Sequence, residues 1–281
     1  MSDDTIAEPI EHLEQVKRLT RDLRVAATTL STQEARFLVD AYYAMQEDRI
    51  RAAHQDRTLA EAAEPHAVMA WLQGERETLE HQVRRALDAY SGGQPAGVWM
   101  RSIPGIGPVI AAGLLANIDV KQAPTVGHIW RFAGLDPTTA WEKGTKRPWN
   151  ASLKRLCFLI GESFVKVSGN KADIYGQIYK ARKVQEQAKN EAGAFADQAA
   201  ASLAAKRFGK DTEARKWYEQ GKLPPARIHM RAKRYAVKLF LSHMHHVMHE
   251  LEFGAPPPKP YILSHGDHAH YMGPPNWPMQ P

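Results

Sequence analysis

The apolar residues of this chain recur every three or four positions over long stretches, which is the spacing of amphipathic helices. After Ser31 and Thr32, either of which can cap a helix, one predicted face carries Phe37, Leu38, Ala41, Tyr42 and Met45. A second stripe predicts a helix over about 66–90 and consists of Val68, Leu72, Leu79, Val83 and Tyr90. Together the two stripes are typical of a helical hairpin or a short coiled coil.

The helical period continues toward the C-terminus. It predicts a helix from Ser152 to Val167 and a last long helix over about 225–252. Residues 168–222 also read as helical, with no convincing strand alternation. The tail from Gly254 is rich in proline and histidine, and we expect it to wrap over the body as an extended segment. The predicted fold is therefore all-α: a helical bundle with long N-terminal helices, a central helix-hairpin-helix motif and an extended Pro/His-rich C-terminal tail.

The central motif is the most informative stretch. Residues 103–109 read Ile-Pro-Gly-Ile-Gly-Pro-Val, and an apolar helix follows from Pro108. Two glycines around one aliphatic residue allow a sharp bend and a close approach to another group. The amides of Gly105, Ile106 and Gly107 would then lie at a helix N-terminus, where backbone N–H groups hold a phosphate without reading base sequence. The alternative is a tight packing turn between two helices.

The charge of the chain is unevenly distributed. Of its 281 residues, the first 89 hold 11 Lys+Arg and 17 Asp+Glu, a net charge of −6. The remaining residues hold 26 and 14, a net of +12, which gives the +6 of the whole chain. Such segregation predicts a C-terminal part that binds a polyanion and an acidic N-terminal part with another task.

A cationic loop follows the central motif. Residues 138–149 place Lys143, Lys146 and Arg147 between Trp141 and Trp149, a combination suited to phosphates and stacked bases. On the helix after the loop, Lys154 and Arg155 can face outward and extend the contact. The alternative is a solvated loop that the tryptophans anchor.

Other chemistry is weakly indicated. The single cysteine, Cys157, lies between apolar neighbours, and we expect a buried small side chain in a reducing, cytoplasmic protein. His243, His245, His246, His249, His265, His268 and His270 cluster late. They lack a His-Glu-x-x-His arrangement, so we predict no metal site and no cofactor. No apolar run is long enough for a membrane span, and the acidic N-terminus lacks the features of a signal peptide.

The order of these parts resembles a known family. It is similar to the C-terminal transposase domain of the DEDD-class, guide-RNA-dependent bacterial insertion-sequence transposases. The matching stretches are Ser-Ile-Pro-Gly-Ile-Gly at 102–107, Phe-Ala-Gly-Leu-Asp-Pro at 132–137 and Arg-Pro-Trp-Asn-Ala-Ser-Leu-Lys-Arg-Leu at 147–156. The resemblance covers roughly residues 66–252, with an apparent insertion near 180–215. It divides the chain into an acidic helical region (1–64), a transposase-like helix-hairpin-helix domain (65–252) and the tail (253–281).

The chain also departs from that family. Its members carry an N-terminal ribonuclease-H-like domain with metal-binding acidic residues, whereas residues 1–64 are short and read as helical. The family's nucleophilic serine has no counterpart in the loop, where the only hydroxyls belong to Thr138, Thr139 and Thr145. Trp149 stands where the family has a glycine.

Three functions remain open from the sequence. We favour a protein that binds DNA or structured RNA and lacks recombinase chemistry. The second hypothesis is an active recombinase subunit that uses the hydroxyl of Thr138 or Thr139 with acidic residues from a partner. The third is an assembly protein that reuses the helical scaffold. We also expect a homo-oligomer through the N-terminal helices, and no membrane partner.

Overall fold

The computed structural model describes residues 18–60, 67–205, 207–209, 211–258 and 272–279. Within these residues it contains eleven α-helices, two short 3-10 helices and no strand, which confirms the predicted all-α class. The α-helices are α1 (Arg21–Ala26), α2 (Thr32–Ala60), α3 (Ala67–Gly92), α4 (Pro95–Arg101), α5 (Pro108–Asn117), α6 (Val126–Phe132), α7 (Ala151–Val167), α8 (Ile174–Glu191), α9 (Ala196–Ala205), α10 (Glu213–Glu219) and α11 (Pro225–Phe253). The 3-10 helices are η1 (Ala27–Thr29) and η2 (Val120–Gln122).

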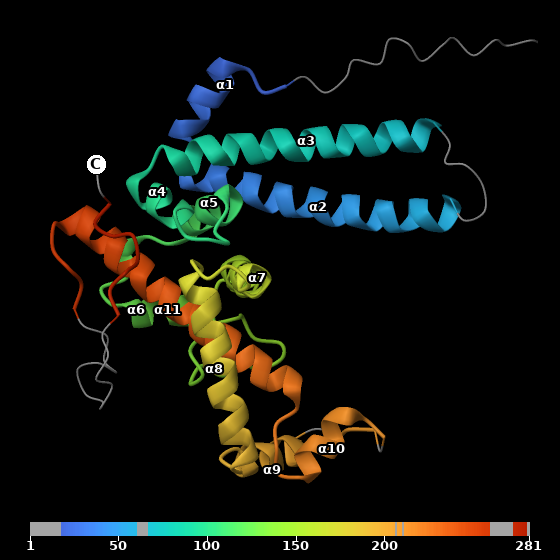
Figure 1. Ribbon diagram of the computed structural model, residues 1–281. Helices are drawn as coiled ribbons and strands as arrows, with labels where there is room; N and C mark the ends of the chain where they lie inside the picture. Colours follow the sequence, from blue (N-terminus) through green and yellow to red (C-terminus); the bar gives the residue numbers. More distant parts are fainter. Residues whose placement is uncertain (1–17, 61–66, 206, 210, 259–271, 280–281) are drawn as a thin grey trace, which may run out of the picture.

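The long helices α2 and α3 lie along each other as an antiparallel pair that extends to one side of the body (Figure 1). Ser31 caps α2 in a reciprocal arrangement. Its hydroxyl accepts a hydrogen bond from the Glu34 amide, and the Glu34 carboxylate accepts one from the Ser31 amide. The sequence boundary at 64/65 falls between the two helices of this pair. Phe37, placed by its period on the packing face of α2, is 71% exposed.

The short helix α5 lies at the centre of the fold. Eight of its ten residues are buried, so it is apolar around its whole circumference rather than amphipathic. It packs against α2, α3, α4 and α7. Gly113 permits the contact with α7, since a Cβ at this position would lie 2.8 Å from a methyl group of Leu156.

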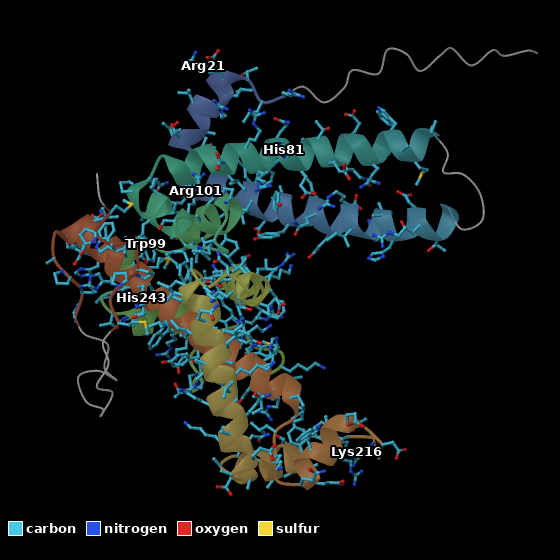
Figure 2. All side chains as sticks on the ribbon, in the orientation of Figure 1. Arg21, His81, Trp99, Arg101, Lys216 and His243 are labelled. Carbon is cyan, nitrogen blue, oxygen red and sulfur yellow. The ribbon has the colours of Figure 1, made fainter. Side chains whose placement is uncertain are left out.

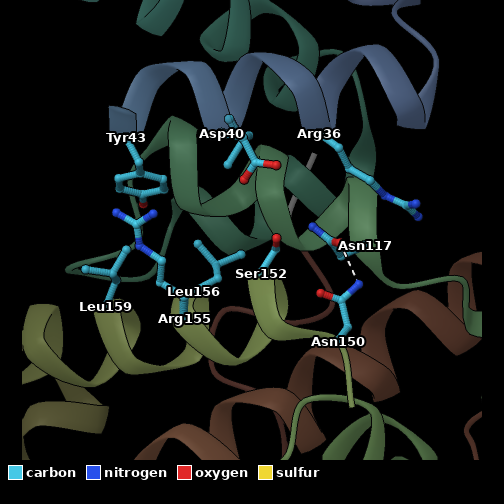
Figure 3. A pocket seen from close by; sticks show the side chains of 10 residues that line it. Arg36, Asp40, Tyr43, Asn117, Asn150, Ser152, Arg155, Leu156 and Leu159 are labelled. Carbon is cyan, nitrogen blue, oxygen red and sulfur yellow. Dashed lines mark hydrogen bonds between the residues drawn. The ribbon is translucent and has the colours of Figure 1, made fainter. Parts of the chain in front are cut away.

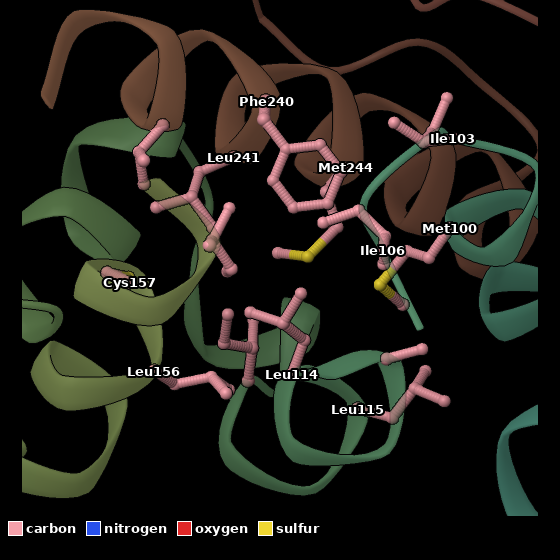
Figure 4. Packing of buried hydrophobic residues seen from close by; sticks show 14 of the residues in the cluster. Met100, Ile103, Ile106, Leu114, Leu115, Leu156, Cys157, Phe240, Leu241 and Met244 are labelled. Atoms are coloured by element: carbon pink, nitrogen blue, oxygen red, sulfur yellow. The ribbon is translucent and has the colours of Figure 1, made fainter. Parts of the chain in front are cut away.

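Helix α11 closes the core from the other side. Figure 4 shows Phe240, Leu241 and Met244 of this helix facing the apolar side chains of α5 and the central motif. Aromatic rings fix this junction. Trp99 stacks on Phe240 with ring centres 6.0 Å apart, and Phe164 and Tyr175 complete the cluster. Burial of these large rings gives the fold much of its apolar stabilisation.

A second, smaller hydrophobic core lies beyond the end of α8, where α9 and α10 pack together (Figure 1). Its buried members are Phe195, Ala199, Tyr218, Leu223 and Ile228. This small core overlaps in part the stretch near 180–215 where we expect an insertion.

The described part of the C-terminal tail, residues 272–279, lies against the body. The Trp99 indole donates to the Pro275 carbonyl at 2.7 Å, and the Trp277 indole donates to the Glu250 carboxylate at 2.5 Å. Figure 2 shows Trp99 and His243 at the end of the body that this segment covers. The expected contacts of His265, His268 and His270 fall outside the described residues.

Candidate nucleic-acid interface

The bend of the central motif is pressed against α7. Gly105 adopts a φ of +88°, which favours glycine, and its carbonyl accepts a hydrogen bond of 2.6 Å from the Ser163 hydroxyl. A Cβ on Gly105 would lie 3.1 Å from both this hydroxyl and a methyl group of Val167. The first glycine of the motif therefore serves a close approach within the molecule.

The second glycine is different. Gly107 has a φ of −88°, which any residue adopts, and a Cβ there would meet no atom within 4 Å. It precedes α5, whose N-terminus has no side-chain cap. The Ile106 amide donates to the Ile103 carbonyl at 3.0 Å, whereas the amides of Gly105 and Gly107 have no hydrogen-bond partner among the described residues. Of the three predicted donors, Ile106 is thus the one already engaged within the molecule.

A glycine shortly before the cationic loop is covered by the tryptophan at the end of that loop. Gly134 ends α6 with a φ of +64°, and a Cβ there would lie 2.9 Å from the Trp149 ring. The ammonium of Lys154 lies 3.7 Å from the centre of the same ring. Trp149 is therefore sandwiched between backbone and side chain, and it anchors the loop as the alternative interpretation of the sequence expected.

Trp141 does not share this role. It is 40% exposed, and its indole N–H donates to the Thr145 carbonyl of its own loop at 2.9 Å. It meets Trp149 edge to face, with ring centres 6.5 Å apart. The guanidinium of Arg147 lies over its ring, 5.6 Å from the ring centre, within the range of about 6 Å for a cation–π contact. The loop thus presents one fixed, accessible indole.

Cations from three segments gather beside this loop. Burial lowers the pKa of Lys154, and the charges of Arg147 and Arg234 lower it further. Burial also lowers the pKa values of Arg234 and Lys238, and Arg234 adds to the effect on Lys238. Among the described carboxylates, only Asp136 opposes these effects, by raising the pKa of Lys238. We call Arg147, Lys154, Arg234 and Lys238 the cation cluster.

Two members of the cluster come from α11 and were absent from the predicted site. Arg227, Arg231, Arg234 and Lys238 follow each other at steps of four, three and four residues, which places them on one face of the helix. This helical spacing was the available signal. Arg231 is bound to the buried Glu186 carboxylate at 2.6 Å, whereas Arg234 has no hydrogen bond or ion pair among the described residues.

The remaining predicted cations fall into two groups, exposed loop side chains and one side chain that pairs with a carboxylate of α2. Lys143 and Lys146 are exposed on the loop. Arg155 instead pairs with Glu47 of α2 and lies 5.3 Å from the centre of the Tyr43 ring. Figure 3 shows it beneath that ring, on the wall of a pocket between α2 and α7. Arg155 therefore connects two helices and does not join the cation cluster.

The motif and the cluster do not meet. Ser163, which contacts the motif, follows Lys154 by nine residues on α7. At about 100° and 1.5 Å per residue, these side chains project from opposite faces of the helix, about 13 Å apart along its axis. The predicted site is thus two patches on either side of α7.

The loop hydroxyl of the recombinase hypothesis has a carboxylate beside it. The Thr138 hydroxyl donates to Asp136 at 2.8 Å, and the Thr138 amide donates to the same oxygen at 2.9 Å. These two bonds lower the pKa of Asp136, which makes its carboxylate a weaker base. The arrangement is that of a side-chain-stabilised turn.

Other candidate groups are enclosed. Cys157 is buried and burial raises its pKa to about 12, which agrees with a packing role. His243 lies between the Tyr175 hydroxyl and the Met272 carbonyl, at 2.8 Å from each, as expected of a core histidine. Within the described ranges no three His, Cys, Asp or Glu side chains are placed to hold a metal ion, and no helix is long and apolar enough to cross a membrane.

Comparison with known families matches one stretch of this site. Residues 99–147 fit the family described as the IS116/IS110/IS902 transposase family. This segment is related to those transposases. No curated protein and no solved structure matches the chain. The matched segment runs from α4 through the motif, α5 and α6 to Arg147, so the three other members of the cation cluster, on α7 and α11, lie outside it.

Proposed function

We propose that the chain binds DNA or structured RNA through the cation cluster and the exposed cations Lys143 and Lys146. The crowding of Lys154, Arg234 and Lys238 carries this proposal. Burial and the charge of Arg234 lower the pKa values of both Lys154 and Lys238, and a single nearby carboxylate, Asp136, offsets the effect on Lys238. A polyanion would supply the missing negative charge. The transposase-related segment supports nucleic acid as that polyanion.

The central motif supplies a second contact in this proposal. The unpartnered amides of Gly105 and Gly107 at the uncapped N-terminus of α5 suit one phosphate. Since motif and cluster lie on opposite faces of α7, one strand reaches both only by passing around that helix. The contacts named so far involve backbone phosphates, so we expect affinity without strong sequence preference.

The decisive experiment removes charge from the loop. The double substitution Lys146→Ala/Arg147→Ala leaves every described hydrogen bond intact, because neither side chain makes one. We expect weaker binding to duplex, single-stranded and structured RNA probes alike, measured by fluorescence anisotropy across salt concentrations. For duplex DNA, the slope of log affinity against log salt should flatten by up to about 1.8, since each lost phosphate contact contributes about 0.9.

The matched control is Arg21→Ala/Arg24→Ala, which removes the same charge from exposed positions on α1. It should leave affinity and salt slope nearly unchanged. Equal losses in both double variants would indicate a net-charge effect and contradict the proposed site. Unchanged affinity of the loop variant for every probe would overturn the proposed function itself.

We further propose that the protein acts in the cytoplasm as a homo-oligomer through α2 and α3, without recombinase chemistry. Several apolar side chains on this helix pair are exposed, among them Phe37 at 71%, Ile50 at 47% and Leu79 at 41%, which supports a surface for a second copy. Light scattering at micromolar concentration should give a multiple of 31.5 kDa. A monomeric mass would contradict the proposed oligomer. A covalent adduct with DNA that Thr138→Ala abolishes would contradict the proposed lack of recombinase chemistry.

A further inference from the structure

The indole of Trp141 has no role in the packing of the body. Of the three tryptophans in and before the cationic loop, Trp149 has its ring covered by Gly134 and Lys154. Trp130 donates to the Lys238 carbonyl at 3.1 Å and lies 4.1 Å beneath the Lys238 ammonium. Trp141 is 40% exposed and bonds only within its own loop. At this exposure part of the indole remains accessible to a ligand.

The ring is held in place before any ligand arrives. Its N–H is fixed on the Thr145 carbonyl, and its contact with Trp149 ties it to the anchored part of the loop. A rigid aromatic surface loses little conformational entropy on binding. Arg147 of the cation cluster lies on the same loop and over the Trp141 ring, and the other members lie on α7 and α11, so phosphates bound there would bring their bases near the indole.

Accessible bases distinguish the classes of nucleic acid. In a duplex the base faces are stacked on one another, and an exposed indole on a loop has no face to meet. In an unpaired strand each base offers a face, and stacking on an aromatic side chain is tolerant of sequence. Resting on the proposed function, we infer that the site takes an unpaired strand of nucleic acid, with one base stacked on Trp141 while the neighbouring phosphates contact the cation cluster.

The cationic face of α11 indicates the path of this strand over the protein surface. The row from Arg227 to Lys238 spans eleven residues, or about 16 Å along the helix. Arg227 bonds only to hydroxyl groups, of Ser202 and Tyr218, and so keeps its charge unneutralised. A strand stacked on Trp141 therefore continues over Lys154 and Arg234 toward the α9–α10 core.

The test separates bases from phosphates. Binding of Trp141→Ala and Trp141→Phe is measured by anisotropy with a labelled single strand, an abasic strand of the same length and a duplex of the same sequence. Trp141→Ala should weaken binding to the single strand about tenfold, the effect of losing one stacked base. Binding to the abasic strand and the duplex should not change, and Trp141→Phe should recover part of the loss. Deoxyribose and ribose strands are run in parallel.

The control is Phe253→Ala at the end of α11, because Phe253 is also an exposed aromatic side chain, at 51%, and lies outside the site. It should bind all three probes as the unaltered protein does. The stacking inference would be overturned if Trp141→Ala lost affinity equally for the abasic and the base-bearing strand. It would also be overturned if Trp141→Ala lost no affinity for the base-bearing strand. If Lys146→Ala/Arg147→Ala still weakens every probe in that case, the proposed function stands and only the unpaired-strand inference fails.

Discussion

The ammonium group of Lys154 lies 3.7 Å from the centre of the Trp149 ring. This contact joins the first turn of α7 to the end of the loop before it. It also places the Lys154 ammonium near Arg147 and Arg234, and burial together with these two charges lowers the pKa of Lys154. The same contact thus anchors the loop and concentrates positive charge beside it.

Arg234 and Arg231 lie three residues apart on α11 and differ in their partners, so they form a matched pair. Arg234→Met removes a cation that makes no described hydrogen bond and relieves repulsion of Lys154 and Lys238. We expect unchanged or slightly higher stability in urea unfolding, with weaker binding of nucleic acid. Arg231→Met removes a hydrogen bond to the buried Glu186 carboxylate and should cost about 1–3 kcal/mol.

The opposite ranking of these two variants in stability would contradict the assignment of Arg234 to the interface. Arg182 also pairs with Glu186, so the Glu186 carboxylate keeps one positive partner in Arg231→Met. This remaining ion pair limits the expected loss of stability.

Gly134 is required twice over, by its φ of +64° and by the Trp149 ring upon it. Gly134→Ala should therefore lower the free energy of unfolding by about 1–3 kcal/mol and change the near-ultraviolet circular dichroism of the tryptophans. Gly144→Ala is the control, because Gly144 also has a positive φ but no atom within 4 Å of a Cβ. Gly144→Ala should lower the free energy of unfolding through backbone strain alone and leave the near-ultraviolet spectrum unchanged. Identical spectra for both variants would argue against the packing of Trp149 on Gly134.

Protonation of His243 should destabilise the fold in mild acid. Burial lowers its pKa from 6.5 to about 4, and its Nε2 donates to the Met272 carbonyl while Nδ1 accepts from the Tyr175 hydroxyl. Between these two pH values the unfolded chain binds a proton that the folded chain does not, so stability falls as the pH falls. The full difference amounts to about 3 kcal/mol.

His243→Gln removes this proton linkage. Urea unfolding between pH 6.5 and 5 should show a shallower fall in stability for the variant than for the unaltered protein. Some dependence persists, because burial also lowers the pKa of His245. An equally steep fall in both proteins would mean that the folded chain accommodates the charged imidazolium.

The sequence by itself determined the helical class and most helix positions. The reason is local: a helix needs only a repeating apolar face and suitable ends, and both are written in neighbouring residues. Ser31 and Glu34 at the start of α2, and Gly254 just after the end of α11, are examples of such ends. The charge segregation and the central motif were visible for the same reason.

The tertiary structure decided which of these features share a surface. It placed Arg155 against Glu47 of α2 and brought Arg234 and Lys238 beside Lys154. It also set the motif on the opposite side of α7 from the loop. Such relations depend on the crossing of helices distant in the sequence, and a helical period fixes the face of a residue but not its neighbour. The distinct roles of Trp141 and Trp149 follow from the same packing, because only the second has Gly134 beneath it.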